Sequence, residues 1–169
     1  MTRLSYAPEV SGVRIEPVRY DAPVAQLLVA EAMAELARRY GGGGDETPVA
    51  VSDFDPPGGA FLVAYLVGEP AGCVGWRSFG GTTVAELKRM YTRPAARGRG
   101  VARALLAAVE ESARAYGRTR MILECGDRQP EAVSLYLSHG YEKIEDFGHY
   151  KDEPGVISLG RALTPPILA

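Results

Sequence analysis

Hydrophobic and polar positions along the first forty residues predict one strand followed by one helix. Residues 13–19 alternate between apolar and polar side chains, which is typical of a half-buried strand. Pro17 cannot donate a ladder hydrogen bond, so this strand is expected near a sheet edge. Asp21 is a candidate helix cap and Pro23 suits a first turn. The apolar positions from Leu27 to Tyr40 predict the helix itself.

A glycine-rich segment and three apolar runs follow. The segment, residues 41–59, predicts an irregular loop, and we expect substrate selection near it. Asp53 and Asp55 within it have two interpretations, contact with a cationic substrate or surface Asx turns. Turn residues separate the three apolar runs, which predict an antiparallel meander of strands at 60–67, 71–79 and 84–92.

The second half of the chain alternates helix and strand. Apolar residues at helical spacing predict a helix over 101–116, with Glu110 and Arg114 on its polar face. A second helix is expected to begin at Pro130. Three short apolar runs predict further strands at 121–125, 141–144 and 156–161. No internal repeat is visible, and the element order predicts an α+β (mixed α/β) fold.

The length of 169 residues suits a single domain with a good core. We expect that domain at residues 13–163, between a loose N-terminal tail, residues 1–12, and a C-terminal tail, residues 164–169. The formal net charge of −2 gives no general electrostatic reason to bind nucleic acid or an acidic membrane. No signal peptide is apparent, and no apolar run approaches the roughly 20 residues of a membrane span.

The two cysteines, Cys73 and Cys125, both lie inside apolar runs. Neither has zinc-type spacing with the two histidines, so we expect free thiols and no metal. Free buried thiols are typical of a reducing compartment, and the sequence therefore predicts a cytoplasmic protein.

The stretch from Arg97 to Ala102 carries the strongest chemical signal. Two glycines, Gly98 and Gly100, lie where a predicted strand gives way to a helix. Because a helix start leaves backbone N–H groups unpaired, the stretch predicts an anion site. It lacks the lysine and hydroxyl of an NTPase phosphate loop and the third glycine of a dinucleotide fold. Six basic residues in and around it predict a surface patch for a compact polyanion: Lys88, Arg89, Arg93, Arg97, Arg99 and Arg103.

The motif Arg97-x-x-Gly100-x-Ala102 matches the Q/R-x-x-G-x-G/A signature of the GCN5-related N-acetyltransferases, the GNAT superfamily. Further on, Leu135-Tyr136-x-x-His139-Gly140-Tyr141 matches as well, and the chain resembles this superfamily from about residue 13 to residue 163. The resemblance implies a central, mostly antiparallel, twisted sheet with a splayed parallel strand pair, flanked by helices.

The resemblance also implies acetyl-CoA as cosubstrate, without a metal. In the superfamily, backbone N–H groups of the signature loop hold the CoA pyrophosphate. These map onto the stretch that Arg97 begins, at Gly98, Arg99, Gly100, Ala102 and Arg103. Met90 and Thr92 are expected to pair through their main chains with the pantetheine arm. Gln129 stands where many relatives carry an asparagine that contacts the cofactor.

Two side chains are candidates for proton transfer by the same resemblance. Tyr136 aligns with the tyrosine that protonates the departing sulfur, although a core helical tyrosine is the alternative. Glu86 lies eleven residues before Arg97, the offset of the catalytic glutamate in histone-acetylating members. We expect Glu86 to take a proton from the amine, directly or through water. The alternative is an exposed glutamate paired with Lys88 or Arg89.

The predicted function is transfer of an acetyl group to a primary amine of a small molecule by direct attack. A protein N-terminus or lysine as acceptor stays open, and so does a non-catalytic acyl-CoA-binding module. A homodimer is also left open. No motif in the sequence identifies the acceptor.

Overall fold

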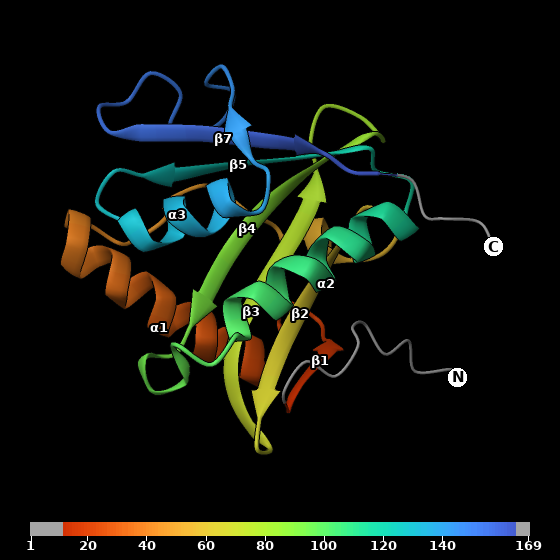
Figure 1. The fold of residues 1–169 in the computed structure, drawn as a ribbon, viewed down its shortest axis with the longest axis vertical. Helices are drawn as coiled ribbons and strands as arrows, with labels where there is room; N and C mark the ends of the chain where they lie inside the picture. Colours follow the sequence, from red (N-terminus) through yellow and green to blue (C-terminus); the bar gives the residue numbers. More distant parts are fainter. Residues whose placement is uncertain (1–11, 165–169) are drawn as a thin grey trace.

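The computed structural model describes residues 12–164, so the two expected tails lie almost wholly outside the described residues. A seven-stranded sheet is flanked by helices on both faces (Figure 1). The elements in chain order are β1 (Val13–Pro17), α1 (Pro23–Tyr40), the 3-10 helix η1 (Val51–Phe54), β2 (Gly59–Leu66), β3 (Glu69–Ser78), β4 (Val84–Thr92), the 3-10 helix η2 (Pro94–Ala96), α2 (Val101–Ala115), β5 (Arg120–Gly126), α3 (Pro130–Ser138), β6 (Glu142–Lys143) and β7 (Val156–Ala162).

The strand order is β1-β2-β3-β4-β5-β7-β6, and β4 with β5 is the parallel pair. Its pairing is short and runs from Val84 opposite Arg120 to Glu86 opposite Ile122. Beyond Glu86 the two strands diverge, as Figure 1 shows. The expected α+β fold with one splayed parallel pair is therefore confirmed, and β1 lies at a sheet edge as Pro17 predicted.

A bulge interrupts β4 just after the parallel pairing ends. The register with β3 shifts between Cys73 and Gly75, and Arg89 adopts a φ of 60°. A bulge adds one residue to a strand, so two consecutive side chains can face the same side of the sheet. Lys88 and Arg89 both turn inward, with side chains 6% and 5% exposed.

The core has two parts, one on each face of the sheet. Alternate side chains of β2 point to opposite faces of the sheet. Leu62 packs in the cluster that includes α2, and Phe61 packs in the cluster that includes α1. In Figure 1, α2 crosses β2 and β3, while α1 runs beside β4 toward α3. The N-terminal half of α1 buries Ala25, Leu28 and Ala32, which fixes this helix against the sheet.

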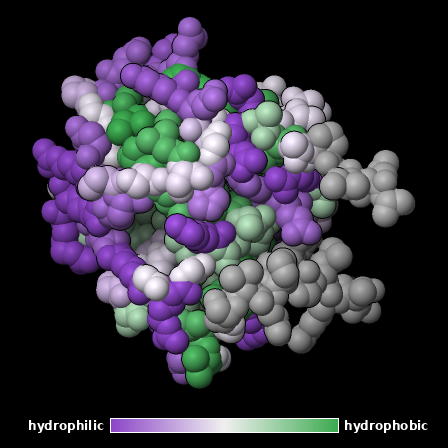
Figure 2. Space-filling view, in the orientation of Figure 1, coloured by the Kyte–Doolittle hydropathy of each residue, from purple (hydrophilic) through white to green (hydrophobic). Residues whose placement is uncertain are grey.

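Hydrophobic residues reach the surface mainly near α3 on the face that Figure 2 shows. There they gather over the area that α3 and β7 occupy in Figure 1, within a hydrophilic surround. Leu137 of α3 is 52% exposed, whereas Leu135 and Ile157 pack partly against the main core. No helix within residues 12–164 combines the length and the apolar character that crossing a membrane requires.

Two details of the helices differ from the sequence prediction. Ala22, not Asp21, is the residue before α1, and no side chain caps the helix. The Asp21 carboxylate instead accepts a hydrogen bond from Arg19 Nε at 2.9 Å. Glu110 is buried rather than on a solvent face of α2. It accepts a hydrogen bond from Tyr141 Oη at 3.0 Å, and the expected ion pair with Arg114 is present at 3.8 Å.

The predicted basic patch is not a single surface. Lys88 and Arg89 face inward because of the bulge. Two other members form ion pairs with glutamates of α1: Arg93 with Glu31 at 2.7 Å and Arg97 with Glu35 at 2.6 Å. Arg99 and Arg103 are exposed beside the start of α2. Sequence spacing grouped these residues, but the bulge and α1 separate them.

Candidate active site

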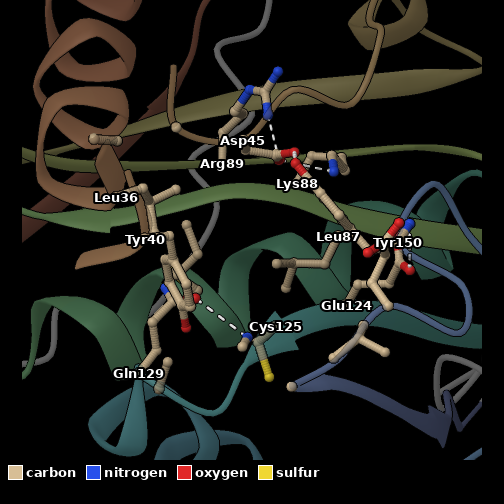
Figure 3. A pocket seen from close by; sticks show the side chains of 18 of the residues that line it. Leu36, Tyr40, Asp45, Leu87, Lys88, Arg89, Glu124, Cys125, Gln129 and Tyr150 are labelled. Carbon is tan, nitrogen blue, oxygen red and sulfur yellow. Dashed lines mark hydrogen bonds and ion pairs between the residues drawn. The ribbon is translucent and has the colours of Figure 1, made fainter. Parts of the chain in front are cut away.

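A cleft of about 230 Å³ opens where β4 and β5 diverge. Figure 3 shows its walls, which come from α1, β4, β5, the start of α3 and two loops. Since strand pairing stops at Glu86, the β4 backbone from 87 to 92 has no strand partner on the β5 side. An extended ligand can therefore hydrogen-bond along this free edge.

The signature loop forms an anion cradle at the start of α2. Gly98 and Gly100 have φ values of 76° and 81°, which favour glycine, and a Cβ added at either would meet nothing within 4 Å. The first intrahelical bond is from Ala104 N–H to Gly100 O at 3.1 Å. Within residues 12–164, no acceptor is recorded for the backbone N–H groups from 98 to 103. These amides and the positive end of the helix dipole can bind a phosphate group.

The side chains of the loop surround the cradle without filling it. Arg97 turns back, since its Nε donates to Thr92 O at 3.1 Å and its guanidinium pairs with Glu35. Arg99 and Arg103 are exposed, and Ala102 is half-buried in the first turn of the helix. The loop therefore offers an anion unpaired backbone N–H groups, with the two exposed cations Arg99 and Arg103 around them.

Three further predicted cofactor residues lie along the opening. Met90 lines the cleft, and Thr92 ends the free edge of β4. Gln129 lines the cleft as the residue before α3, and its Oε1 accepts from Gly126 N–H at 3.3 Å. Met90 and Gln129 thus line one cleft from β4 and from the residue before α3, while Thr92 leads through η2 to the start of α2.

Tyr136 is both a core residue and a cleft residue. Its side chain is 4% exposed and packs edge-to-face on Tyr141, with ring centroids 5.6 Å apart. It lines the cleft, and no residue from 12 to 164 hydrogen-bonds its phenol oxygen. Burial raises the pKa of this phenol, so it holds its proton across the physiological range. A phenol that keeps its proton and lines the cleft can donate to a ligand.

Glu86 lies deeper than the cleft wall. Its side chain is 2% exposed, and Oε1 accepts from Arg77 Nε at 2.9 Å. The partner is Arg77 of β3 rather than the Lys88 or Arg89 considered from the sequence. Of the predicted site residues, Met90, Gln129 and Tyr136 line the cleft, whereas Glu86, Thr92 and the residues of the signature loop are not part of its lining.

Glu124 of β5 is the cleft carboxylate that the sequence reasoning missed. Its Oε2 accepts from the Tyr150 N–H at 3.1 Å, while Oε1 is buried without a hydrogen-bond partner in residues 12–164. Burial raises the pKa of this carboxyl, and the Tyr150 hydrogen bond opposes the shift only in part. The available signal was a lone glutamate in an apolar strand, twelve residues before Tyr136.

A second acidic residue, Asp45, lines the cleft from the glycine-rich segment. Its carboxylate pairs with Lys88 and Arg89 and accepts from Tyr150 Oη at 3.0 Å. Burial alone would raise the pKa of Asp45, but the two cations and hydrogen bonds from Thr47 outweigh it and hold the pKa well below its usual range. The segment 41–59 therefore does contribute to the site, through Gly44 and Asp45.

The other two aspartates of that segment have local roles. Asp53 accepts from Ala50 N–H at 2.9 Å and pairs with Arg77 at 3.2 Å. Asp55 follows η1, where its carbonyl accepts from the Gly58 N–H at 3.1 Å. Neither lines the cleft, so turn formation is the interpretation that fits both.

Both cysteines are free thiols, as expected. Cys73 is buried in the sheet, whereas Cys125 lines the cleft beside Glu124. Burial raises the pKa of Cys125 to about 12, so this thiol is a poor nucleophile at neutral pH. A search of residues 12–164 finds no group of three His, Cys, Asp or Glu side chains arranged to hold a metal ion.

Comparisons with known proteins find relatives of this chain in sequence and in fold. The model of the acetyltransferase (GNAT) family matches residues 29–141. An IAA acetyltransferase from Azospirillum brasilense is 38% identical over 96 residues, which are 56% of this chain and 61% of that protein. An uncharacterized N-acetyltransferase of Escherichia coli K12, YjgM, is 36% identical over 94 residues, which are 54% of this chain and 56% of that one. The matched region thus spans about three fifths of these relatives.

Among solved structures, a GNAT family acetyltransferase from Elizabethkingia anophelis with acetyl-CoA bound superimposes with a TM-score of 0.66. The match covers 91% of this chain and 100% of the other, at 17% sequence identity. At this identity the likeness concerns the fold.

Proposed function

Because the chain belongs to the acetyltransferase (GNAT) family, we propose that it is an acetyl-CoA-dependent N-acetyltransferase that acetylates a primary amine of a small molecule. One observation carries the proposal. A free strand edge, a phenol that keeps its proton and a carboxylate with a raised pKa meet at one cleft between β4 and β5. The start of α2, with its unpaired amides, follows β4 through η2.

The chain's own residues fit a CoA thioester. The amides of 98–103 would bind the pyrophosphate, and the open space outside Gly98 and Gly100 leaves room for it. The free edge of β4 around Met90 and Thr92 would pair with the amides of the pantetheine arm. Gln129 would contact the arm from the opposite wall. The acetyl thioester supplies the electrophilic carbon when it is bound.

Tyr136 is proposed as the general acid. In the reaction the amine nitrogen bonds to the acetyl carbon, the carbon–sulfur bond breaks, and the departing sulfur gains a proton. A thiol leaves as the thiolate at modest cost, since its pKa is about 8.5, but a placed donor speeds the step. The Tyr136 phenol supports this role because it stays protonated and has no competing partner in residues 12–164.

Glu124 is proposed as the general base, and Glu86 is kept as the alternative. A base must reach the ammonium of the acceptor, and the Glu124 carboxylate lines the cleft. Burial raises the pKa of Glu124 toward neutral pH, where the pKa of an efficient general base lies. Glu86 is occupied by Arg77 and lies behind the wall, so it supports the sheet and could act only through intervening groups.

Release of CoA thiol from acetyl-CoA over a panel of small amines tests the proposed function. We expect turnover with at least one amine and none with the corresponding N-acetylated compounds. Thermal stabilisation by acetyl-CoA without turnover on any amine would instead support the acyl-CoA-binding module. Turnover only on peptides would support the protein acetyltransferase alternative.

Localisation, domain bounds and oligomeric state are further proposals. The free thiols Cys73 and Cys125 support a reducing compartment, so we propose the cytoplasm. We also retain the single domain, residues 13–163, and the homodimer as proposals. Sedimentation of the purified chain tests the latter.

A further inference from the structure

The cleft carries a buried cluster of charges that acetyl transfer itself does not require. Lys88 Nζ lies 3.0 Å from Asp45 Oδ2, and the Arg89 guanidinium pairs with the same oxygen. The Lys88 side chain is 6% exposed, that of Arg89 5% and that of Asp45 17%. One carboxylate thus serves two buried cations, although buried charges are stable only when they are well compensated.

Asp45 has little capacity left to compensate Lys88. Its Oδ1 accepts from Thr47 N–H at 3.0 Å, from Thr47 Oγ1 at 2.6 Å and from Tyr150 Oη at 3.0 Å. The Arg89 guanidinium has a second partner, because it also donates a hydrogen bond to Thr47 O at 3.4 Å. Asp45 and Arg89 therefore form a closed group with Thr47 and Tyr150.

Lys88 is the member with unused capacity. An ammonium has three N–H donors, and among residues 12–164 the only anionic partner recorded for it is Asp45. Lys88 is nine-tenths buried and lines the cleft, as Figure 3 shows beside Asp45. An anion in the cleft would satisfy the remaining donors.

The opposite charge faces the same cleft from the next strand. Glu124 of β5 presents a carboxylate with one oxygen lacking a partner in the described residues. Of the other two acidic side chains on the wall, Asp45 is already paired and Glu153 is exposed, so water screens Glu153. The buried wall thus holds Lys88, Arg89, Asp45 and Glu124, two positive and two negative groups, and it suits a ligand that is neutral overall.

We propose that the acceptor is an amino acid with a free carboxylate, which pairs with Lys88 while its amine faces Glu124. The inference rests on the proposed function, because it assigns the acceptor of that reaction. A simple monoamine would add a positive charge and leave Lys88 under-compensated, whereas a zwitterion matches both groups. The apolar wall of α1, with Ala32, Met33 and Leu36, favours an amino acid with a neutral, apolar side chain.

Three acceptors that share one side chain test the inference: leucine, leucinamide, and 3-methylbutylamine, which lacks the carboxyl group. CoA thiol release gives kcat/KM for each. We expect leucine to exceed both analogues at least about tenfold, the effect of one charge-assisted contact. Equal or better use of the amide and the amine would overturn the inference and leave the acetyltransferase intact. No turnover on any of the three, with turnover on other amines of the panel, would overturn the inference alone, and no turnover on any amine would overturn both.

Variants at Lys88 separate recognition from structure. Lys88→Met should reduce the leucine-to-leucinamide preference to near one, mainly through KM for leucine, and Lys88→Arg should restore part of it. Lys143→Met, at an exposed lysine of β6, is the matched control and should keep the full preference. A preference that survives in Lys88→Met would contradict the assignment. Because the wild-type comparison stands alone, the inference is decided even if Lys88→Met does not fold.

Discussion

At the scale of single residues, the site depends on polar groups that the fold buries and leaves incompletely paired. Glu124 Oε1 is buried without a hydrogen-bond partner in residues 12–164, and the Tyr136 phenol lines the same cleft. Burial raises the pKa of each, which keeps the phenol protonated and makes the carboxylate more basic. Unpaired buried groups cost stability, so their presence in one cleft indicates a use in binding or catalysis.

Replacing Tyr136 with phenylalanine removes the proposed proton donor and little else. We expect kcat to fall about 10- to 1000-fold with unchanged affinity for acetyl-CoA, because the ring still packs on Tyr141. Steady-state kinetics and calorimetric titration measure the two quantities. Tyr20→Phe, in the separate core cluster beside α1, is the control and should be fully active. Full activity of Tyr136→Phe would remove this residue from the mechanism.

Gly148 controls the position of Glu124. A Cβ at Gly148 would overlap Glu124 Oε1, so Gly148→Ala must displace the carboxylate. We expect kcat to fall at least about tenfold while acetyl-CoA binding persists, because a misplaced base loses most of its effect. Gly58→Ala is the control, since a Cβ there has only ordinary contacts. A Gly148→Ala enzyme with wild-type kcat would separate Glu124 from the chemistry.

At the scale of elements, the site is assembled where regular pairing fails. The β4 bulge turns Lys88 and Arg89 inward, and the splay leaves a free strand edge. The end of α1 is then tied across to the β5–α3 loop: Arg39 donates to Arg128 O and Arg128 to Arg39 O, each at 2.9 Å. The cleft is thus held open by contacts around its rim rather than by the sheet alone.

Asp45 joins the glycine-rich segment to β4, and its loss should destabilise the fold. Asp45→Asn leaves two buried cations without their anion. This should lower the free energy of unfolding by about 3–5 kcal/mol. The pKa of Asp45 is lowered in the fold, so its contribution is present above the unfolded pKa of about 3.9 and is lost as pH falls through the lower folded value. The wild-type advantage should therefore shrink below about pH 4.

Urea unfolding between pH 3 and pH 7 measures this difference. Asp152→Asn is the control, because Asp152 is exposed and its φ of 64° suits asparagine. A pH-independent difference between wild type and Asp45→Asn would show that the carboxylate charge is not what stabilises the segment.

The start of α2 is the element that should bind the cofactor. Gly100→Asp places a negative charge at the cradle, so the affinity for acetyl-CoA should fall more than about tenfold. Gly80→Asp is a matched control, since Gly80 also has a positive φ, 62°, and open space around its Cα. Isothermal titration compares the two. Equal affinities would refute the cradle.

At the scale of the whole molecule, the sequence predicted the architecture better than the site. Periodicity placed the meander, the edge strand with Pro17 and the helix after Gly100, because these depend on local pattern. The roles of Lys88 and Glu124 depend on a bulge and on the face that β5 turns to the cleft. Both are set by contacts between segments distant in the chain, which a local pattern does not contain.

The central claim is that acetyl transfer occurs in this cleft with Glu124 as the base. The most direct measurement is the pH dependence of kcat in wild type, Glu124→Gln and Glu86→Gln. Because a base acts deprotonated and burial raises the pKa of Glu124, the wild-type rate should rise with pH through a value above the usual 4.3 or so. Glu124→Gln should lose this rise and about 100-fold in kcat, whereas Glu86→Gln should keep it. The reverse result, with the rise lost only in Glu86→Gln, would contradict the account.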